Sequence, residues 1–98
     1  MRVSSMTSPR TGREVANQFL IEDGSRIVFQ SYNSMIAEID YSTNTIKIGA
    51  DWDYSRTTSK YRNAFFEEYI PTLASADAIR KALKVGQTEN GYYKVIRA

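Results

Sequence analysis

The dipeptide Asp23-Gly24, placed between two stretches rich in apolar residues, restricts the fold of this chain more than any other feature. Val15–Glu22 before it carries apolar residues at both odd and even positions, which indicates a strand with much of both faces covered. Arg26–Tyr32 after it has apolar residues on one face, as a half-buried strand does. Because Asp and Gly tolerate positive φ angles, this dipeptide favours the tight turn of a hairpin. The two stretches therefore predict a β-hairpin.

A second hairpin is predicted directly downstream. Met35–Asp40 and Thr45–Gly49 both show a two-residue alternation, and the turn-forming residues Tyr41–Asn44 lie between them. A helix over Asn33–Glu38 is the competing interpretation, because a mixed segment of this length fits either period.

The apolar period lengthens to that of a helix after Tyr54. Ser55 is placed to cap the first turn, and Pro71 ends the helix. The buried stripe of this helix is expected to contain Thr58, Tyr61, Phe65, Phe66, Tyr69 and Ile70. A second helix is predicted from about Ser75 to Gly86, because glycine suits the residue that follows a helix. Its buried face is expected to contain Ala76, Ile79, Ala82 and Leu83.

These elements predict an α+β fold, with an antiparallel β-sheet packed against two helices. The sheet would consist of the two hairpins and a C-terminal strand from Tyr92–Arg97, a segment rich in residues that favour strands. The length of 98 residues suits one small core, and we expect a single domain over residues 12–98. Residues 1–11 lack apolar periodicity and contain Arg2 and Arg10 without an acidic residue, which predicts a flexible basic arm.

The chain contains no cysteine and no histidine, which excludes thiol nucleophiles, thiolate metal sites and Ser-His triads. We therefore expect no catalysis, no metal site and no cofactor. A nuclease that works without histidine is the alternative, and its candidate residues are Arg56, Lys60, Tyr61, Arg62 and Glu67. No apolar run approaches the roughly 18 residues of a membrane span, and the N-terminus does not resemble a signal peptide. A cytoplasmic location is therefore expected.

Asp51–Phe66 combines aromatic, hydroxyl and basic side chains and is the strongest candidate for a binding surface. Trp52 and Tyr54 share a parity, and we expect both rings to close one end of the core; a stacking platform is the alternative. A helix start with Arg56 and Lys60 nearby suits an anion, but Ser and Thr also cap helices without any ligand. The candidate binding residues of this segment are Trp52, Arg56, Lys60, Arg62 and Asn63.

Two further basic groups are candidate contacts to a nucleic-acid backbone. Arg10 and Arg13 lie in the N-terminal segment, and Arg80, Lys81 and Lys84 lie in the second predicted helix. An ordinary solvated surface is the competing interpretation. The net charge of only +2 permits weak attraction to nucleic acid and does not require it.

Three blocks of the sequence resemble a known family. They are SPRTGREVANQFLI (Ser8–Ile21), FQSYNSMIA (Phe29–Ala37) and WDYSRTTSKYRNAF (Trp52–Phe65), in this order. They resemble a family of small proteins of unknown function from phages and other mobile elements of bacteria. The resemblance covers roughly Ser8–Val85, leaves out the N-terminal MRVSSMT, and implies a phage or mobile-element origin. It implies no activity and no catalytic residues.

The sequence therefore predicts a non-enzymatic binding module, encoded by a phage or mobile element, that modulates a macromolecule of its bacterial host. Its target would be a component of host defence, as for an anti-CRISPR protein, or a component of gene expression. The alternative is a small nucleic-acid-binding accessory protein that uses the basic arm and the aromatic, basic helix start. Pairing of Val15–Glu22 or Tyr92–Arg97 across a homodimer is left open.

Overall fold

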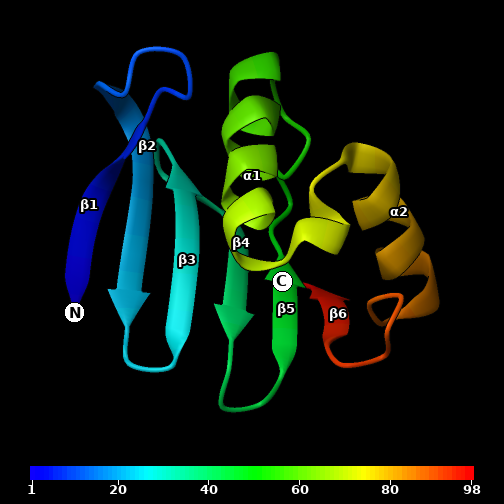
Figure 1. Ribbon diagram of the computed structural model, residues 1–98. Coiled ribbons are helices and arrows are strands. Elements are labelled where there is room, and N and C mark those ends of the chain that lie inside the picture. Colours follow the sequence, from blue (N-terminus) through cyan, green and yellow to red (C-terminus); the bar gives the residue numbers. More distant parts are fainter.

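The computed structural model describes residues 1–98 and confirms the α+β class, with one open six-stranded sheet and two helices (Figure 1). The strands are β1 (Arg2–Thr7), β2 (Glu14–Asp23), β3 (Arg26–Ser31), β4 (Ser34–Asp40), β5 (Thr45–Ile48) and β6 (Lys94–Arg97). The helices are α1 (Arg56–Tyr69) and α2 (Ala76–Val85), joined by the short 3₁₀ helix η1 (Pro71–Leu73). The strands are ordered β1 to β6 across the sheet, as they are along the chain.

The first predicted hairpin is confirmed as the pair β2–β3. Leu20 lies opposite Phe29, and Asp23 lies opposite Arg26. Gly24 and Ser25 therefore form a two-residue turn. The φ angle of Gly24 is +62°, which is the left-handed conformation that such turns require and that glycine adopts without strain.

The second predicted hairpin is confirmed as the pair β4–β5, and the alternative helix over Asn33–Glu38 is wrong. β4 is a central strand that pairs with β3 on one side and β5 on the other. Its residues Ile36–Ile39 are all buried. Pairing on both sides satisfies the backbone groups that a helix would otherwise satisfy internally.

The expectation of a flexible arm over residues 1–11 is corrected, because Arg2–Thr7 form β1 at the edge of the sheet. Val3 lies opposite Ile21 of β2, and Ser5 lies opposite Phe19. No residue of this edge strand is fully buried, so its sequence lacks the apolar alternation of a half-buried strand. The loop that follows is closed by a hydrogen bond from the Ser8 amide to the Arg13 carbonyl, with an N–O distance of 2.8 Å.

The predicted C-terminal strand is confirmed over the shorter range of β6, and it runs parallel to β5. Val95 lies beside Ile46 in this parallel pair. Between the two strands the chain passes through both helices and returns in the same direction (Figure 1). A connection of this length is what parallel strands require, whereas the other strands are joined by short turns and loops.

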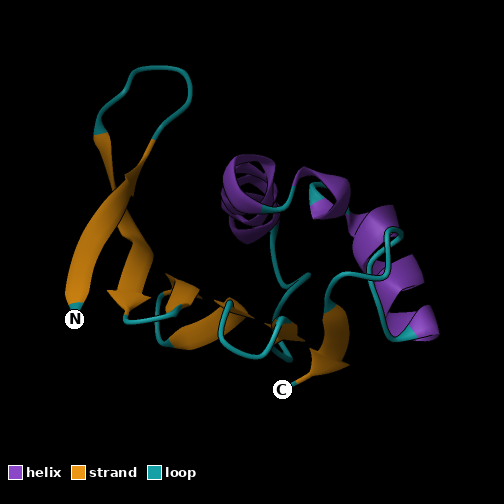
Figure 2. Ribbon diagram, turned by 60° about the horizontal axis from the view of Figure 1, so that its bottom comes forward, coloured by secondary structure: helices purple, strands orange, loops and turns teal.

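Both helices lie on one face of the sheet, and the other face carries no helix (Figure 2). The core lies between these layers, where the Phe65 ring of α1 stacks on the Phe29 ring of β3 at a centroid distance of 6.0 Å. The predicted capping residues Ser55 and Gly86 are confirmed, and Ser75 caps α2 in addition. The Ser55 hydroxyl accepts a hydrogen bond from the Thr58 amide, and the Ser75 hydroxyl accepts one from the Ala78 amide. Gly86 ends α2 with a φ angle of +90°.

Candidate functional site: a tyrosine-flanked pocket

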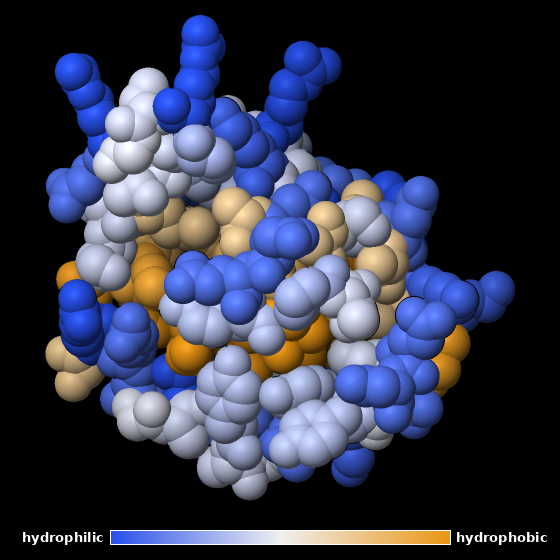
Figure 3. Space-filling model, viewed as in Figure 1, coloured by the Kyte–Doolittle hydropathy of each residue, from blue (hydrophilic) through white to orange (hydrophobic).

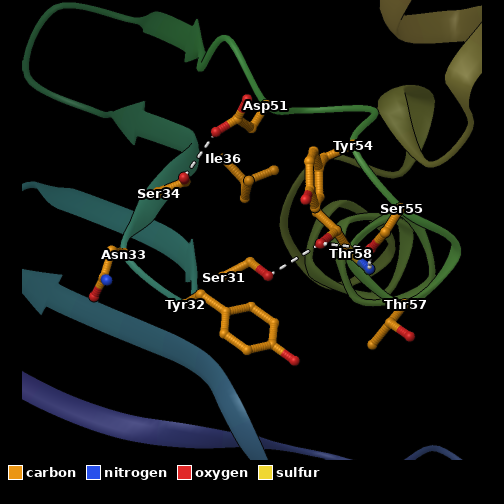
Figure 4. A pocket seen from close by; sticks show the side chains of 10 residues that line it. All are labelled: Ser31, Tyr32, Asn33, Ser34, Ile36, Asp51, Tyr54, Ser55, Thr57 and Thr58. Atoms are coloured by element: carbon orange, nitrogen blue, oxygen red, sulfur yellow. Dashed lines mark hydrogen bonds between the residues drawn. The ribbon is translucent and has the colours of Figure 1, made fainter.

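A pocket of about 560 Å³ lies between the β3–β4 turn, the loop after β5 and the first turn of α1 (Figure 4). Seven of its ten lining residues carry a hydroxyl group, and Ile36 gives it an apolar wall. The rings of Tyr32 and Tyr54 lie at its sides and belong to two different loops (Figure 4). Their residues are 60% and 79% exposed, respectively, which is high for aromatic residues. The pocket therefore offers a mixed polar and aromatic surface.

Tyr32 is held in an uncommon backbone conformation. Ser31 and Ser34 are paired, so Tyr32 and Asn33 form a two-residue turn between β3 and β4. The φ angle of Tyr32 is +54°, close to that of Gly24 at the same position of the β2–β3 turn. For a residue with a side chain this conformation costs about 1–2 kcal/mol. The chain thus keeps a tyrosine beside the pocket at a position that favours glycine.

A hydroxyl network fixes the inner part of the pocket. The Ser31 and Thr58 hydroxyls share a hydrogen bond of 3.0 Å, and the Ser55 hydroxyl donates to that of Thr58 at 3.1 Å. On the opposite wall the Ser34 hydroxyl donates to the Asp51 carboxylate at 2.8 Å. These bonds join the end of β3 to the start of α1, so the framework between the two tyrosines is rigid.

Tyr32, Tyr54 and Thr57 provide hydroxyl groups that are free for a ligand, and the Asn33 side-chain amide is free as well. These three hydroxyls form no hydrogen bond within the protein, whereas Ser31, Ser34, Ser55 and Thr58 are all engaged. No histidine or cysteine is present to act as a base or a nucleophile. The arrangement suits recognition of a partner by packing and adaptable hydrogen bonds.

The expectation that Trp52 and Tyr54 both face the core is met by Trp52 alone. Trp52 is 9% exposed, whereas Tyr54 points outward beside the pocket. The reason is that the chain turns after β5. The Trp52 amide donates to the Gly49 carbonyl and the Tyr54 amide to the Asp51 carbonyl, each at 3.1 Å. This turn ends the two-residue alternation on which the expectation rested.

Arg62 is the main correction among the candidate binding residues, because it is only 1% exposed. Its guanidinium donates to the Trp52 carbonyl at 2.9 Å and to the Asn63 side-chain oxygen at 2.8 Å. It also pairs with Asp53 at 3.4 Å and lies over the Trp52 ring, 5.2 Å from the centroid. Burial lowers the pKa of Arg62, and the hydrogen bond and charge of Asp53 oppose that shift. Arg62 and Asn63 therefore serve the internal structure of this region.

Arg80 joins α2 to the same cluster. Its guanidinium pairs with Asp77 at 2.7 Å and with Asp53 at 3.4 Å, and it lies 5.8 Å from the Trp52 ring centroid. The structure thus gathers Trp52, Arg62 and Arg80 around Asp53, where they connect the loop after β5 to both helices.

The remaining basic candidates are exposed and belong to separate elements. Arg10 and Arg13 lie in the β1–β2 loop, Arg56 and Lys60 on α1, and Lys81 and Lys84 on α2. None of these six side chains forms an ion pair.

The residues proposed for a nuclease do not share one surface. Tyr61 and Arg62 are buried, whereas Arg56, Lys60 and Glu67 are exposed.

Sequence reasoning missed the β3–β4 side of the pocket, including Tyr32, Asn33 and Ser34, whereas Asp51 and Tyr54 lie in the segment Asp51–Phe66 that it singled out. The available signal was the short gap between the predicted strands Arg26–Tyr32 and Met35–Asp40, because a turn this short requires a residue with a positive φ angle.

The side chains of the chain form no group of three or more acidic, histidine or cysteine residues that could hold a metal ion. No helix combines the length and the apolar character needed to cross a membrane.

Comparisons with known proteins give a family without an assigned activity. The family model "Family of unknown function (DUF8033)" matches residues 1–84. The match includes the N-terminal segment MRVSSMT, which the resemblance of the sequence blocks had left outside. No curated protein and no solved structure matches the chain. The matched region spans β1 through most of α2, and the chain therefore belongs to the DUF8033 family of unknown function.

Proposed function

We propose that the chain is a non-enzymatic binding module that recognises a protein of a bacterial host through the tyrosine-flanked pocket. The observation that supports this proposal is the exposure of Tyr32 and Tyr54 on either side of a pocket whose walls are held by internal hydrogen bonds. Two exposed aromatic rings at the sides of one pocket offer a surface on which a side chain of a partner could pack.

The composition of the pocket favours a protein partner. Tyrosine supplies a large contact area with few rotatable bonds, and the free hydroxyls of the two tyrosines and the Asn33 side-chain amide supply adaptable hydrogen bonds, as in antibody binding sites. Ile36 adds an apolar wall against which an inserted side chain could pack. The positive φ angle of Tyr32 further supports a functional role, because local strain persists where the surrounding structure fixes it and is frequent at binding sites.

The host and the class of target come from the resemblance described above. A phage or mobile-element protein of this kind would act in the cytoplasm of the bacterial host, on a defence component or a component of gene expression. A module of 98 residues can act there by covering a surface of its target.

A pull-down from nuclease-treated bacterial lysate tests this proposal. The wild-type chain should retain one host protein, and Tyr54→Ala and Tyr32→Gly should each lose it. Tyr92→Ala is the matched control, because Tyr92 is also 60% exposed but lies far along the chain, before β6. Equal retention by all four proteins would refute the pocket as the contact site.

Binding of nucleic acid is the second candidate function. Arg10 and Arg13 in the β1–β2 loop and Arg56 at the start of α1 lie at the same end of the molecule and have no ion-pair partner (Figure 1). Fluorescence anisotropy with short DNA and RNA over a salt series tests it. The affinity should fall with rising salt and should fall further in the variant Arg10→Ala/Arg13→Ala/Arg56→Ala. Binding that does not change with salt would contradict a backbone contact.

A further inference from the structure

A second hollow, separate from the tyrosine-flanked pocket, lies between the β1–β2 hairpin and α1. It has a volume of about 300 Å³, and five of its nine lining residues are hydrophobic. Met6 and Leu20 line it from the hairpin, and Ala64, Phe65 and Tyr69 line it from α1. We call this hollow the hairpin groove. Hydrophobic atoms are visible at the surface between the hairpin and the helix (Figure 3).

The hairpin groove exists because the helical layer does not extend over the first two strands. α1 packs over β3 through the contact of Phe65 with Phe29, and α2 lies on the far side of α1 near β6 (Figure 2). Met6 and Leu20 reach the edge of the core but remain only partly buried. The two helices lie on one face of the sheet but do not reach β1 and β2. Apolar side chains of these two strands therefore remain uncovered on that face.

Charges differ between the two ends of the hairpin groove. Glu68 is exposed and lines the groove near the C-terminus of α1, and Glu22 lies at the same end of β2. Burial raises the pKa of Tyr69, and the charges of Glu68 and Glu22 raise it further. Both carboxylates are therefore close enough to this lining residue to affect its ionisation. Arg2 is opposite Glu22 in the sheet but forms no ion pair with it.

Positive charge lies beyond the other end of the hairpin groove, in a loop whose arginines do not line it. Arg10 and Arg13 belong to the β1–β2 loop, which lies at the same end of the molecule as the N-terminus of α1 (Figure 1). The carbonyl end of α1 adds partial negative charge next to Glu68. A ligand with a positive and a negative end would therefore bind in one direction.

We propose that the hairpin groove binds a basic amphipathic helix of a partner protein, which lies antiparallel to α1 and completes the helical layer. Apolar residues spaced three or four positions apart would insert between Met6, Leu20 and Ala64. Basic residues near the N-terminus of this helix would face Glu68 and Glu22. The negative end of its dipole would face the Arg10–Arg13 loop.

A helix from a second copy of the chain does not fit this site. α2 is the basic amphipathic helix of the chain, with Arg80, Lys81 and Lys84, but its apolar residues Ile79 and Ala82 are buried in its own core. The partner is therefore a different protein.

Binding of designed peptides to the whole chain tests the proposal. The probe is a leucine–lysine amphipathic peptide of 14 residues, the length of α1, and its counterparts carry glutamate in place of lysine or a scrambled order. The leucine–lysine helix should bind at least roughly tenfold more tightly than either counterpart. Equal binding of the scrambled peptide, or no binding at all, would overturn the proposal.

Adjacent carboxylates provide a matched pair of variants. Glu67 and Glu68 are both exposed on α1, but only Glu68 lines the groove. Glu68→Lys should weaken binding of the basic peptide by roughly fivefold, whereas Glu67→Lys, with the same net charge, should change it less than about twofold. Ala64→Phe should fill the groove and abolish binding while thermal unfolding shows that the fold is kept. Equal effects of the two lysine variants would contradict the proposed site.

The direction of the bound helix is tested with a nitroxide label at the N-terminus of the peptide. Paramagnetic broadening should affect the backbone amides of Glu68 and Tyr69 and spare those of the Arg10–Arg13 loop. Broadening at the loop would show a parallel helix and would contradict the charge argument.

Discussion

Burial of a guanidinium group is costly unless its donors have partners, and each of the three guanidinium nitrogens of Arg62 has at least one. Its nitrogen atoms donate to Trp52, Asp53, Ser59 and Asn63, and its charge lies against the Trp52 ring. Arg62 therefore acts as a central connection between α1 and the loop after β5.

Removal of Arg62 should destabilise the fold more than removal of its exposed neighbour. Arg62→Ala leaves a cavity and a buried Trp52 carbonyl without a donor, and we expect a loss of about 3 kcal/mol in the free energy of unfolding. Arg62→Lys should recover less than half of this loss, because an ammonium group cannot reproduce the planar set of donors. Lys60→Ala should cost less than about 0.5 kcal/mol. Urea unfolding measures all three, and similar values for Arg62 and Lys60 would show that Arg62 is not structural.

Two substitutions of Tyr32 separate the role of its ring from that of its backbone. Tyr32→Ala and Tyr32→Gly both remove the ring, but only glycine relieves the strain at a φ angle of +54°. The glycine variant should be more stable than the alanine variant by about 1 kcal/mol. Thermal and urea unfolding give this difference, and a more stable alanine variant would contradict the left-handed conformation.

The burial of most residues in α1 could be predicted from the sequence, but that of Arg62 could not. Thr58, Tyr61, Phe65 and Phe66 are buried as the helical period predicts. Arg62 lies four residues after Thr58 and three before Phe65, so it is on the same stripe. Its charge led to the expectation of an exposed position, because the partners that allow burial come from a loop whose path the sequence did not show.

At the scale of elements, strands with apolar alternation and capped helices were predictable, but the edges of the sheet were not. β1 lies at one edge of the sheet and has no apolar periodicity, because neither of its faces is fully buried. β6 was expected as a strand, but its parallel direction follows from the path through both helices. Local sequence patterns show which segments form strands, and the connections between them determine which strands pair.

Gly49, directly after β5, lies in close contact with the backbone at the start of β4. Its amide donates to the Ile36 carbonyl at 2.9 Å, and a Cβ atom at this position would overlap the backbone carbonyl of Met35. Gly49→Ala should therefore destabilise the fold by about 3 kcal/mol, because backbone atoms cannot move away cheaply. Gly12→Ala is the control, since Gly12 has a φ angle of +72° but open space around it, and it should cost about 1 kcal/mol. Chemical unfolding distinguishes the two, and equal costs would exclude a steric role of Gly49.

At the scale of the whole molecule, side chains from distant parts of the sequence form the two ends of the structure. Tyr32 and Tyr54 come together at the pocket from two different loops, which no spacing in the sequence indicates. At the other end Tyr41 from the β4–β5 turn and Tyr93 from the loop before β6 make an edge contact, with ring centroids 6.3 Å apart. The candidate site and this second aromatic cluster therefore depend on the complete fold.

Stability should fall at alkaline pH because of three tyrosines. Burial raises the pKa of Tyr41, Tyr69 and Tyr93 above their ordinary value of 10.0, and for Tyr69 and Tyr93 neighbouring charges raise it further. The folded chain thus keeps phenol protons that the unfolded chain has already lost. The contribution of these protonated tyrosines to the free energy of unfolding is complete below their ordinary pKa. It is lost as the pH rises through their raised pKa values in the folded chain.

Urea unfolding between about pH 9 and about pH 11 measures this loss, and absorbance at the tyrosinate band reports the ionisation directly. The triple variant Tyr41→Phe/Tyr69→Phe/Tyr93→Phe should lose less stability over this interval than the wild-type chain, because its rings carry no proton to release. Loss of the same size in both proteins would show that these three tyrosines do not cause the alkaline effect. In that case the hydroxyls of these tyrosines would be solvated in the folded state, and the aromatic cluster would be more open than the fold indicates.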